Sequence, residues 1–360
     1  MPDSDSINSP YANDSITPII FEESVRSRPG MYFRSTSSKG IIYAIDQLIK
    51  ECIELCAAED FTFNVSINDG NSFSIKINGR TNLSPFLQAL TVPIVDYNYL
   101  YSRALTVVTT RFELTNDKIH ILLTNGQAHA ENRHEIEGHH TSLVLCFEID
   151  EKIFPDTNVD YLALNQELVL IPIINRKTEI ITRDKRTKYL NQNYYHFPNG
   201  IFYVFDSILN SLNGKPNLQI KYEGSIEENE YQIAISGWEW KPSVTSFANY
   251  VHTTCHGSLV DGVIDGIILA CKKYSNENNL DYFKVTRKKI LKNLIIVCAV
   301  KGAAFDYGGS FKEKLLSDEV RFQSKKLVSK WIYDYLKNDE NVRNSIIRHF
   351  DERRLFPFEL

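Results

Sequence analysis

The sequence lacks any apolar run long enough to cross a membrane. One of its longer runs, residues 294–300, is far shorter than the roughly 20 residues that a transmembrane helix needs. Residues 1–15 are rich in Ser, Asp and Asn, and they lack the basic and apolar regions of a secretory signal. We therefore expect a soluble, cytoplasmic protein without a membrane partner.

The sequence also has no CxxC pair. Its six cysteines lie mostly inside apolar segments, which predicts reduced, buried thiols. The cluster His252-Thr-Thr-Cys255-His256 has residue types that bind metals, but a fourth ligand and a second spaced pair are missing. We interpret this cluster as a loop or the end of a strand, and we expect no metal site.

An overall excess of basic residues is absent as well, because 40 Lys and Arg stand against 45 Asp and Glu. The resulting net charge of -5 argues against a protein that coats nucleic acid through its whole field. Residues 272–301 are a local exception, with eight basic and two acidic side chains. They allow two interpretations: weak, sequence-independent contact with DNA phosphates, or a solvated helix face from which Lys288 and Lys289 project.

What is present predicts about two domains, because 360 residues with 43% apolar residues can form two ordinary cores. Apolar residues recur at three- and four-residue intervals over 39–59, which predicts a buried amphipathic helix. Residues 61–67 and 73–77 alternate apolar and polar residues across a turn, which predicts a strand pair. The first domain is therefore expected to be α+β.

Other elements follow from the same patterns. In the first domain we predict strand-like runs at 105–114, 119–123, 143–147 and 179–182, and helices at 85–90 and 159–170. The polar stretch 183–193 suggests a domain boundary near Tyr195. Beyond it we predict a helix opened by the segment 197–200, strands at 218–222, 231–240 and 294–300, and helices at 259–274, 286–292 and 317–336.

Two distant motifs carry a family resemblance. Glu22-Glu-Ser-Val-Arg-Ser-Arg-Pro-Gly-Met-Tyr32 resembles the segment that opens gyrase B and topoisomerase IV B subunits. Phe311-Lys-Glu-Lys-Leu-Leu-Ser-Asp-Glu-Val-Arg321 is similar to the family's transducer loop and the start of its last helix. The resemblance implies a Bergerat (GHKL) ATPase-like α/β sandwich, followed by a ribosomal-S5-like transducer domain.

The resemblance also implies a division of the chain. Residues 1–17 correspond to an N-terminal arm, 18–195 to the ATPase-like domain and 196–360 to the transducer domain. These residues do not extend into the metal-binding TOPRIM domain that takes part in DNA cleavage. We therefore expect no complete topoisomerase activity from them.

At the catalytic positions, the family presents a carboxylate base and, one turn later on the same helix, a magnesium-binding Asn. Those positions are Gln47 and Glu51 in this sequence. A carboxamide can orient a water molecule but cannot accept its proton. Glu51 could hold a cation only by adding negative charge beside a triphosphate. We interpret both side chains as exposed helix residues.

The adenine-binding Asp of the family corresponds to Ile77, which is followed by Asn78 and Gly79. Leaving the adenine amine without its acceptor costs about 1–3 kcal/mol, or roughly five- to 150-fold in affinity. Gly79 matches a family glycine, but a turn explains a lone glycine equally well.

The phosphate-binding segment of the family corresponds to residues 98–108, in which every family glycine is replaced. Glycine lets several backbone N–H groups converge on a phosphate, whereas Tyr97, Tyr99 and Tyr101 place bulk there. This replacement is the strongest argument from sequence against ordinary ATP binding.

Some family positions are retained. Lys312 matches the transducer lysine that reaches the terminal phosphate, and Thr141 matches a threonine on the pocket wall. Tyr11 and Ile16 fall where the arm embraces a second protomer, which implies a homodimer. Each also has a purely structural interpretation. Lys312 can be a solvated loop lysine, Thr141 an ordinary strand residue, and the two arm residues side chains of a tail.

Three functions therefore compete. The first is a non-catalytic, dimeric gyrase B relative that binds or regulates gyrase or topoisomerase subunits, their ligands or DNA, with no cofactor. The second is an ATP-dependent clamp with an altered pocket, in which Lys312 and Glu51 handle ATP and magnesium. The third is a structural protein that clamps DNA with its basic second domain.

Overall fold

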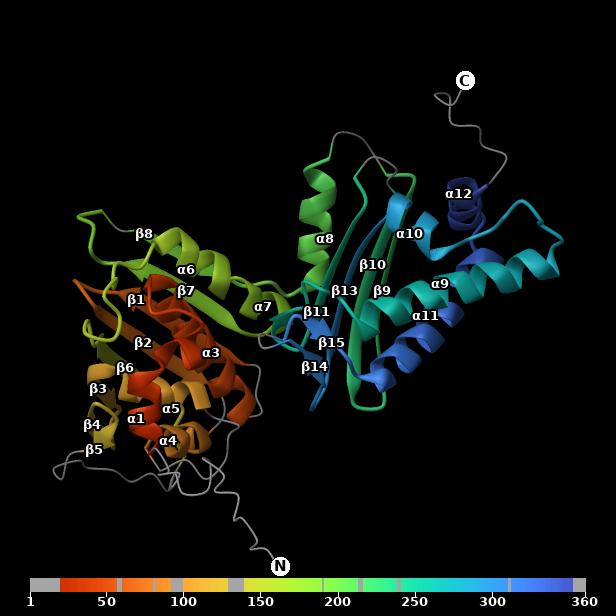
Figure 1. Cartoon of the computed structure of the whole chain (residues 1–360). Helices are drawn as coiled ribbons and strands as arrows, with labels where there is room; N and C mark the ends of the chain where they lie inside the picture. Colours follow the sequence, from red (N-terminus) through yellow and green to blue (C-terminus); the bar gives the residue numbers. More distant parts are fainter. Residues whose placement is uncertain are drawn as a thin grey trace, which may run out of the picture. The chain divides into compact units, whose positions relative to one another are not determined.

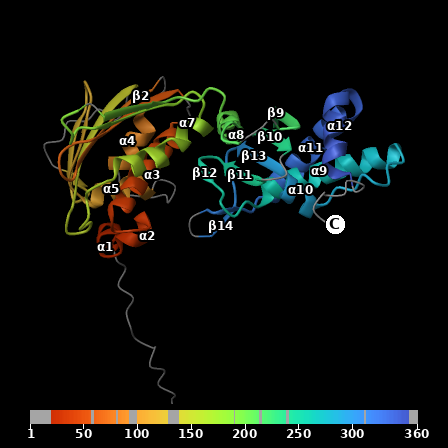
Figure 2. The same ribbon diagram turned by 90° about the horizontal axis from the view of Figure 1, so that it is seen from above.

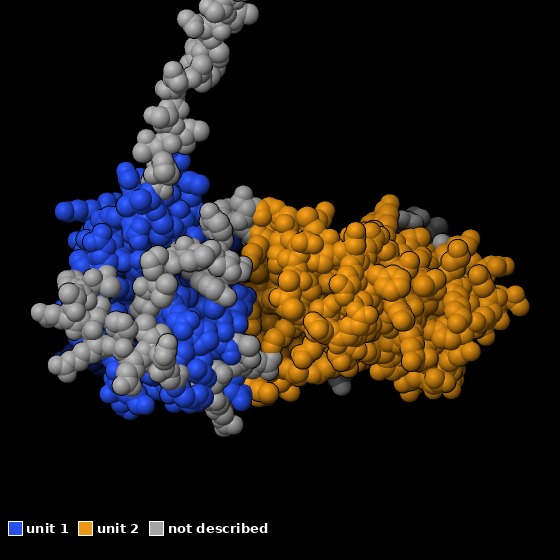
Figure 3. Space-filling view, turned by 90° about the horizontal axis from the view of Figure 1, so that it is seen from below, with its two compact units in different colours: residues 1–167, 180–194 blue, residues 168–179, 195–360 orange. Residues whose placement is uncertain are grey.

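The computed structural model describes residues 20–56, 60–79, 82–91, 100–128, 139–189, 191–212, 216–237, 241–309 and 312–351. The chain divides into two compact units (Figure 3). Unit 1 comprises Met1–Glu167 and Ile180–Tyr194, and unit 2 comprises Leu168–Glu179 and Tyr195–Leu360. The segment Leu168–Glu179, which precedes the boundary expected from sequence, thus packs with the second unit. Within the described ranges, no helix has both the length and the apolar character of a membrane span.

Unit 1 contains an eight-stranded sheet with the order β5-β4-β3-β6-β2-β1-β7-β8 (Figure 1). Its strands are β1 Phe61–Ile67, β2 Ser72–Gly79, β3 Thr109–Thr115, β4 His120–Thr124, β5 Gln127–Ala128, β6 Ser142–Ile149, β7 Glu179–Asp184 and β8 Asn191–Tyr195. In β2, Phe73, Ile75 and Ile77 are fully buried, whereas Lys76 between them is exposed. This alternation gives the sheet one apolar face, as period-two patterning predicts.

Helices gather on one side of this sheet (Figure 2). They are α1 Phe21–Ser27, α2 Pro29–Phe33, α3 Ser38–Leu55, α4 Ser84–Thr91, α5 Leu100–Val107 and α6 Tyr161–Leu168. The helix α3 confirms the amphipathic helix predicted over 39–59, because Ile41, Ile45, Leu48, Ile49 and Cys52 are all fully buried. The central part of unit 1 is therefore a two-layer α/β sandwich.

One predicted strand is partly wrong. The run 105–114 was expected to be extended, but α5 continues to Val107 and β3 begins only at Thr109. Leu105, Val107 and Val108 are all fully buried. Burial requires apolar side chains here whether the segment is helical or extended. A short apolar run cannot by itself distinguish a buried helix from a buried strand.

Unit 2 contains a five-stranded sheet with the order β12-β11-β13-β10-β9. Its strands are β9 Leu218–Ile226, β10 Asn229–Gly237, β11 Ser243–Ala248, β12 Val251–His252 and β13 Leu294–Lys301; β14 Tyr307–Gly308 and β15 Lys314–Leu315 form a separate pair. The helices are α7 Leu170–Ile174, α8 Ile201–Asn210, α9 Ser258–Glu277, α10 Arg287–Asn293, α11 Asp318–Asn338 and α12 Glu340–Phe350. The strand β13 is buried along nearly its whole length, so both faces of this sheet are covered there.

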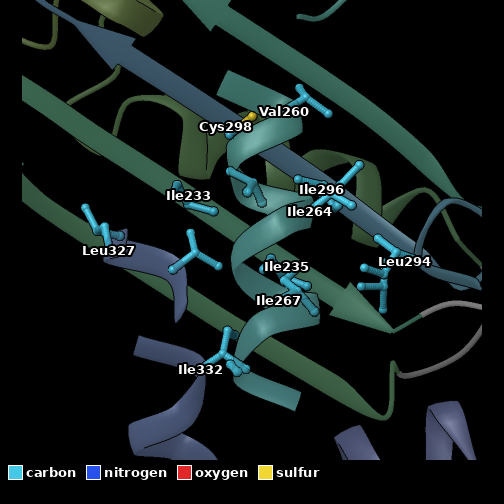
Figure 4. Close-up of a cluster of buried hydrophobic side chains, with 14 of the residues drawn as sticks. Ile233, Ile235, Val260, Ile264, Ile267, Leu294, Ile296, Cys298, Leu327 and Ile332 are labelled. Carbon is cyan, nitrogen blue, oxygen red and sulfur yellow. The ribbon is translucent and has the colours of Figure 1, made fainter. Parts of the chain in front are cut away.

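The larger core of unit 2 lies between the sheet and α9 with α11 (Figure 4). Ile233 and Ile235 of β10 and Ile296 of β13 point toward Ile264 and Ile267 of α9. On the opposite face of the sheet, a smaller cluster joins side chains of α8 to alternate strand residues. Its main members are Ile201, Phe205, Leu209, Ala234, Ile295 and Val297.

The six cysteines are free thiols, but they are not all buried. Cys146 and Cys255 are exposed, in contrast to the expectation that the thiols are enclosed. Cys146 lies on the outward side of β6, between buried Leu145 and Phe147, and Cys255 follows β12 in a turn. The interpretation of the segment 252–256 as a strand end is confirmed, because β12 ends at His252.

Truncating the core of unit 2 tests this packing. We expect Ile264→Ala to lower the free energy of unfolding by about 2–5 kcal/mol, because it leaves a cavity between α9 and the sheet. Leu269→Ala on the same helix is the matched control; its side chain is 45% exposed, so its effect should stay below about 1 kcal/mol. Urea unfolding measures both variants, and equal losses would contradict the described core.

Candidate functional site

The carboxylate of Glu51 lies at the N-terminal end of α5. Glu51 is on α3 and only 5% exposed. Its Oε1 accepts a hydrogen bond from the backbone N–H of Tyr101 at 2.9 Å, and its Oε2 accepts one from the N–H of Ser102 at 2.7 Å. The first N–H groups of a helix have no partner inside the helix and favour an anion. The Glu51 carboxyl group therefore occupies the place at the start of α5 where an anion would bind.

Burial raises the pKa of Glu51 to about 7, although the hydrogen bonds from Ser102 and Tyr101 act in the opposite direction. The carboxylate is therefore largely ionised only above neutral pH. The protonated acid still has oxygen atoms that can accept hydrogen bonds. The expectation that Glu51 is an exposed helix residue is wrong, because α5 packs against α3 on this side.

Gln47, at the base position of the family, lies beside a second buried carboxylate. Its side chain is half-buried, and its Nε2 donates to Oδ2 of Asp46 at 2.9 Å. The Lys50 ammonium lies 2.6 Å from the same oxygen, and Asp46 is fully buried. Gln47 is thus not the exposed residue that we expected, and its amide nitrogen is engaged by Asp46.

Sequence reasoning missed Asp46, although a signal was available. The apolar positions Ile42 and Ile49 stand four residues before and three residues after it, so helical spacing places Asp46 on the buried face of α3. A buried charge requires a partner, and Lys50 one turn later supplies one.

Two half-buried aromatic side chains, one on α3 and one on α5, contact each other beside this cluster. The rings of Tyr43 and Tyr101 meet edge to face with their centroids 5.6 Å apart, and Cζ of Arg34 lies 4.2 Å from the centre of the Tyr43 ring. Burial, followed by the hydrogen bond with Tyr101, raises the pKa of the Tyr43 hydroxyl, so it stays protonated. Tyr97, Asn98 and Tyr99 lie outside the described residues.

The adenine-binding positions lie at the end of β2. Ile77 is fully buried between Phe63 and Leu143 on the neighbouring strands, so its side chain provides packing and no hydrogen-bond acceptor. Asn78 Oδ1 accepts a hydrogen bond from the Ser142 hydroxyl at 3.0 Å.

Packing explains the retained glycine of this segment. The N–H of Gly79 donates to the Thr141 carbonyl at 2.9 Å, and a Cβ atom at Gly79 would lie 2.5 Å from the Phe61 ring. Gly79 is thus the last residue of a strand and not part of a turn. Thr141 is exposed and lies next to it, so the structure brings these two predicted residues together.

Lys312 is exposed and lies in unit 2, between β14 and β15. Its backbone has a φ of 58°, and its N–H donates to the Gly309 carbonyl at 3.3 Å. The ammonium group lies 5.5 Å from the centre of the Tyr307 ring. These contacts hold the loop within unit 2. The predicted arm residues Tyr11 and Ile16 lie outside the described residues.

The basic segment 272–301 is partly engaged by contacts inside unit 2. Arg287 forms an ion pair with Asp261, and the Lys273 ammonium lies 4.1 Å from the centre of the Tyr333 ring. Lys288 is exposed as expected, whereas Lys289 is half-buried and donates to the Lys284 carbonyl at 2.8 Å. Of the two interpretations, the solvated helix face fits Lys288 but only partly fits Lys289, and the Arg287–Asp261 ion pair offsets one of the positive charges.

Comparisons with known proteins find similarity to the B subunit of DNA gyrase. A family model described as DNA gyrase B matches residues 204–354. The B subunit of DNA gyrase from Streptococcus pneumoniae is 23% identical over 359 aligned residues, which cover 90% of this chain and 55% of that protein. The chain therefore spans about half the length of the curated relatives that it matches.

Two solved structures share the fold. The B-subunit of the DNA gyrase from Myxococcus xanthus has a TM-score of 0.75 at 17% identity, over 91% of this chain and 99% of that one. The 43K ATPase domain of Thermus thermophilus gyrase B, in complex with an aminocoumarin, has a TM-score of 0.71 at 16% identity, over 92% and 95%.

These likenesses define the class of the protein, which is an α+β chain with the fold of a gyrase B ATPase and transducer fragment. The predicted fold class is thereby confirmed. Together with the family match, they show that the chain is a distant homologue of the N-terminal region of DNA gyrase B.

The burial of Glu51 predicts a pH dependence. Its pKa rises from 4.5 in the unfolded chain to about 7 in the folded state. Between these values the folded state keeps a proton that the unfolded chain has released, so the free energy of unfolding falls as pH rises. Glu51→Gln has no such titration. The free energy of unfolding of the wild type minus that of Glu51→Gln should therefore fall by up to about 3 kcal/mol between about pH 5 and about pH 8. Urea unfolding at both pH values measures it, and parallel pH profiles would contradict the burial of the carboxyl group.

Proposed function

We propose that this chain is a gyrase B-like protein that acts by binding and not by hydrolysing ATP. In this proposal it is a dimeric regulator whose partners are gyrase or topoisomerase subunits, their ligands or DNA. The observation that carries the proposal is the pair of hydrogen bonds from the N–H groups of Tyr101 and Ser102 to the Glu51 carboxylate.

Those two N–H groups belong to the segment that matches the family's phosphate-binding residues. A phosphate and a carboxylate compete for the same donors, and Glu51 is tethered, so it loses little entropy on binding. Above about pH 7 it also carries a negative charge. Two like charges about 4 Å apart repel by about 1 kcal/mol in water and by about 4 kcal/mol near a protein surface. This repulsion further disfavours a triphosphate.

The other positions support the same conclusion. The buried side chain of Ile77 offers no acceptor to an adenine amine. Gln47 cannot accept a proton from water, and its amide nitrogen is held by Asp46. The residues that the structure describes in this region thus do not fit a magnesium-bound nucleotide. Among the described residues, no specific contact favours the alternative of an ATP-dependent clamp, since both oxygens of Glu51 already accept hydrogen bonds.

Thermal melting with nucleotide tests the proposal. We expect magnesium and ATP at millimolar concentration to leave the melting temperature of the wild type unchanged, because a ligand shifts it only by binding the folded state. The variant Glu51→Ala should melt lower, since losing a helix cap costs about 0.5–2 kcal/mol. In return, its melting temperature should rise on addition of tripolyphosphate, because two N–H groups and their positive dipole become accessible.

Glu54→Ala is the matched control for this experiment. It removes an exposed carboxylate from the same helix without freeing the N–H groups of α5, so tripolyphosphate should not stabilise it. Magnesium-dependent ATP hydrolysis by the wild type that disappears in Lys312→Ala would refute the proposal and favour the clamp.

The dimer is tested separately. We expect light scattering to show two chains per particle for the full chain, and one chain for the double variant Tyr11→Ala with Ile16→Ala. Asn13→Ala in the same segment should remain dimeric. A monomeric wild type, or a double variant that remains dimeric, would remove the arm from the proposal without affecting the nucleotide result.

A further inference from the structure

A pocket of about 230 Å³ lies on the sheet of unit 2, and Lys301, the last residue of the basic segment 272–301, is part of its lining. The register places Glu223 of β9, Gln232 of β10 and Ala299 of β13 in one row across the sheet. Glu230 and Lys301 stand opposite each other in the next row. Because side chains alternate between faces, these residues share the face that also packs against α8.

The helix α8 covers only part of that face. Its apolar side chains contact Ala234, Ile295 and Val297, whereas the pocket begins farther along the strands. Ile174, the last residue of α7, and Arg176, which lies two residues beyond it, form another wall. All of these residues belong to unit 2, so the pocket is formed within one unit.

Charges of both signs converge on this pocket. Arg176 Nη1 lies 2.6 Å from Glu223 Oε1, and both side chains are partly exposed. The Lys301 side chain lies at the end of β13, and burial lowers the pKa of its ammonium group. An ammonium group has three donors, so it can bind a ligand carboxylate in addition to protein groups. Glu230, across from Lys301, supplies an acceptor on the same face.

The size and charge of the pocket limit the ligand. A volume of about 230 Å³ is below the roughly 300–1,000 Å³ of pockets that enclose drug-sized molecules. Two carboxylates in the lining repel polyanions such as nucleotides, and two cations repel metal ions. A small molecule with one positive and one negative charge can bind a carboxylate and a cation of the lining at the same time.

We infer that this pocket binds a free α-amino acid, with its carboxylate at Lys301 and its ammonium group at Glu230. The lining of this pocket contains none of the residues on which the proposed function rests. The inference therefore does not depend on the proposed function.

Calorimetric titration of the full chain with single amino acids tests the inference. At least one common amino acid should bind with a millimolar or lower dissociation constant. The variants Lys301→Met and Glu230→Gln should each weaken that binding by about tenfold or more, because each removes a charge-assisted contact. Lys326→Met, an exposed substitution on α11, should bind like the wild type. The N-acetyl and amide derivatives of the same amino acid each lack one charge, and they should bind as weakly as the two pocket variants.

Three results would overturn the inference. One is the absence of binding by every amino acid at tens of millimolar. Another is binding that persists unchanged in both Lys301→Met and Glu230→Gln. The last is equal affinity for the amino acid, acetate and inorganic phosphate, which would indicate a simple anion site. Since Glu230 is exposed, we expect Glu230→Gln to fold. The test therefore remains decisive even if Lys301→Met does not fold.

Discussion

The contact between the Glu51 carboxylate and the first N–H groups of α5 links two helices that are about fifty residues apart in the chain. It satisfies donors that no residue within α5 can satisfy, and the bond from Ser102 is fully buried whereas the bond from Tyr101 is partly buried. A helix end with this internal partner needs no ligand to be stable. The same two N–H groups would be the donors for an external anion, so the function proposed for unit 1 depends on this contact.

The neighbouring polar groups are only partly satisfied by the protein, because Asp46 Oδ2 has two partners whereas the buried Asp46 Oδ1 has none among the described residues. Asp46 is fully buried and is neutralised by Lys50, and Gln47 donates to it. Tyr43 and Tyr101 occupy the adjacent space with two rings. Replacing solvent-accessible polar groups by mutually bonded or aromatic ones raises the cost of inserting a charged ligand, since each internal contact must first be broken. The proposed function therefore rests on several positions together and not on any one of them.

A feature could be predicted from the sequence when the residues that determine it are close together along the chain. Helix α3 and strands β1 and β2 were predictable, because their periodicity is a local property of the chain. The run at 105–114 was not, since Leu105 and Val107 are buried whether the segment is helical or extended. Glu51 was expected to be exposed, because its partners at 101 and 102 become neighbours only when the chain folds. For Gly79 the sequence left a family glycine and a turn as equal explanations, whereas the Phe61 ring on the paired strand accounts for it, and sequence alone does not reveal cross-strand packing.

A scaffold can keep its fold while its binding residues change, because the two properties depend on different faces of the same helix. The apolar face of α3, with Ile41, Ile45, Leu48 and Ile49, is fully buried against the sheet and supplies the packing energy that keeps the helix in place. The positions that the family uses for catalysis lie between these residues, and polar substitutions there cost little if the new side chains find partners. Glu51 found its partners in α5, and Gln47 in Asp46. A fold likeness with a TM-score of 0.75 at 17% identity is therefore compatible with an altered chemistry.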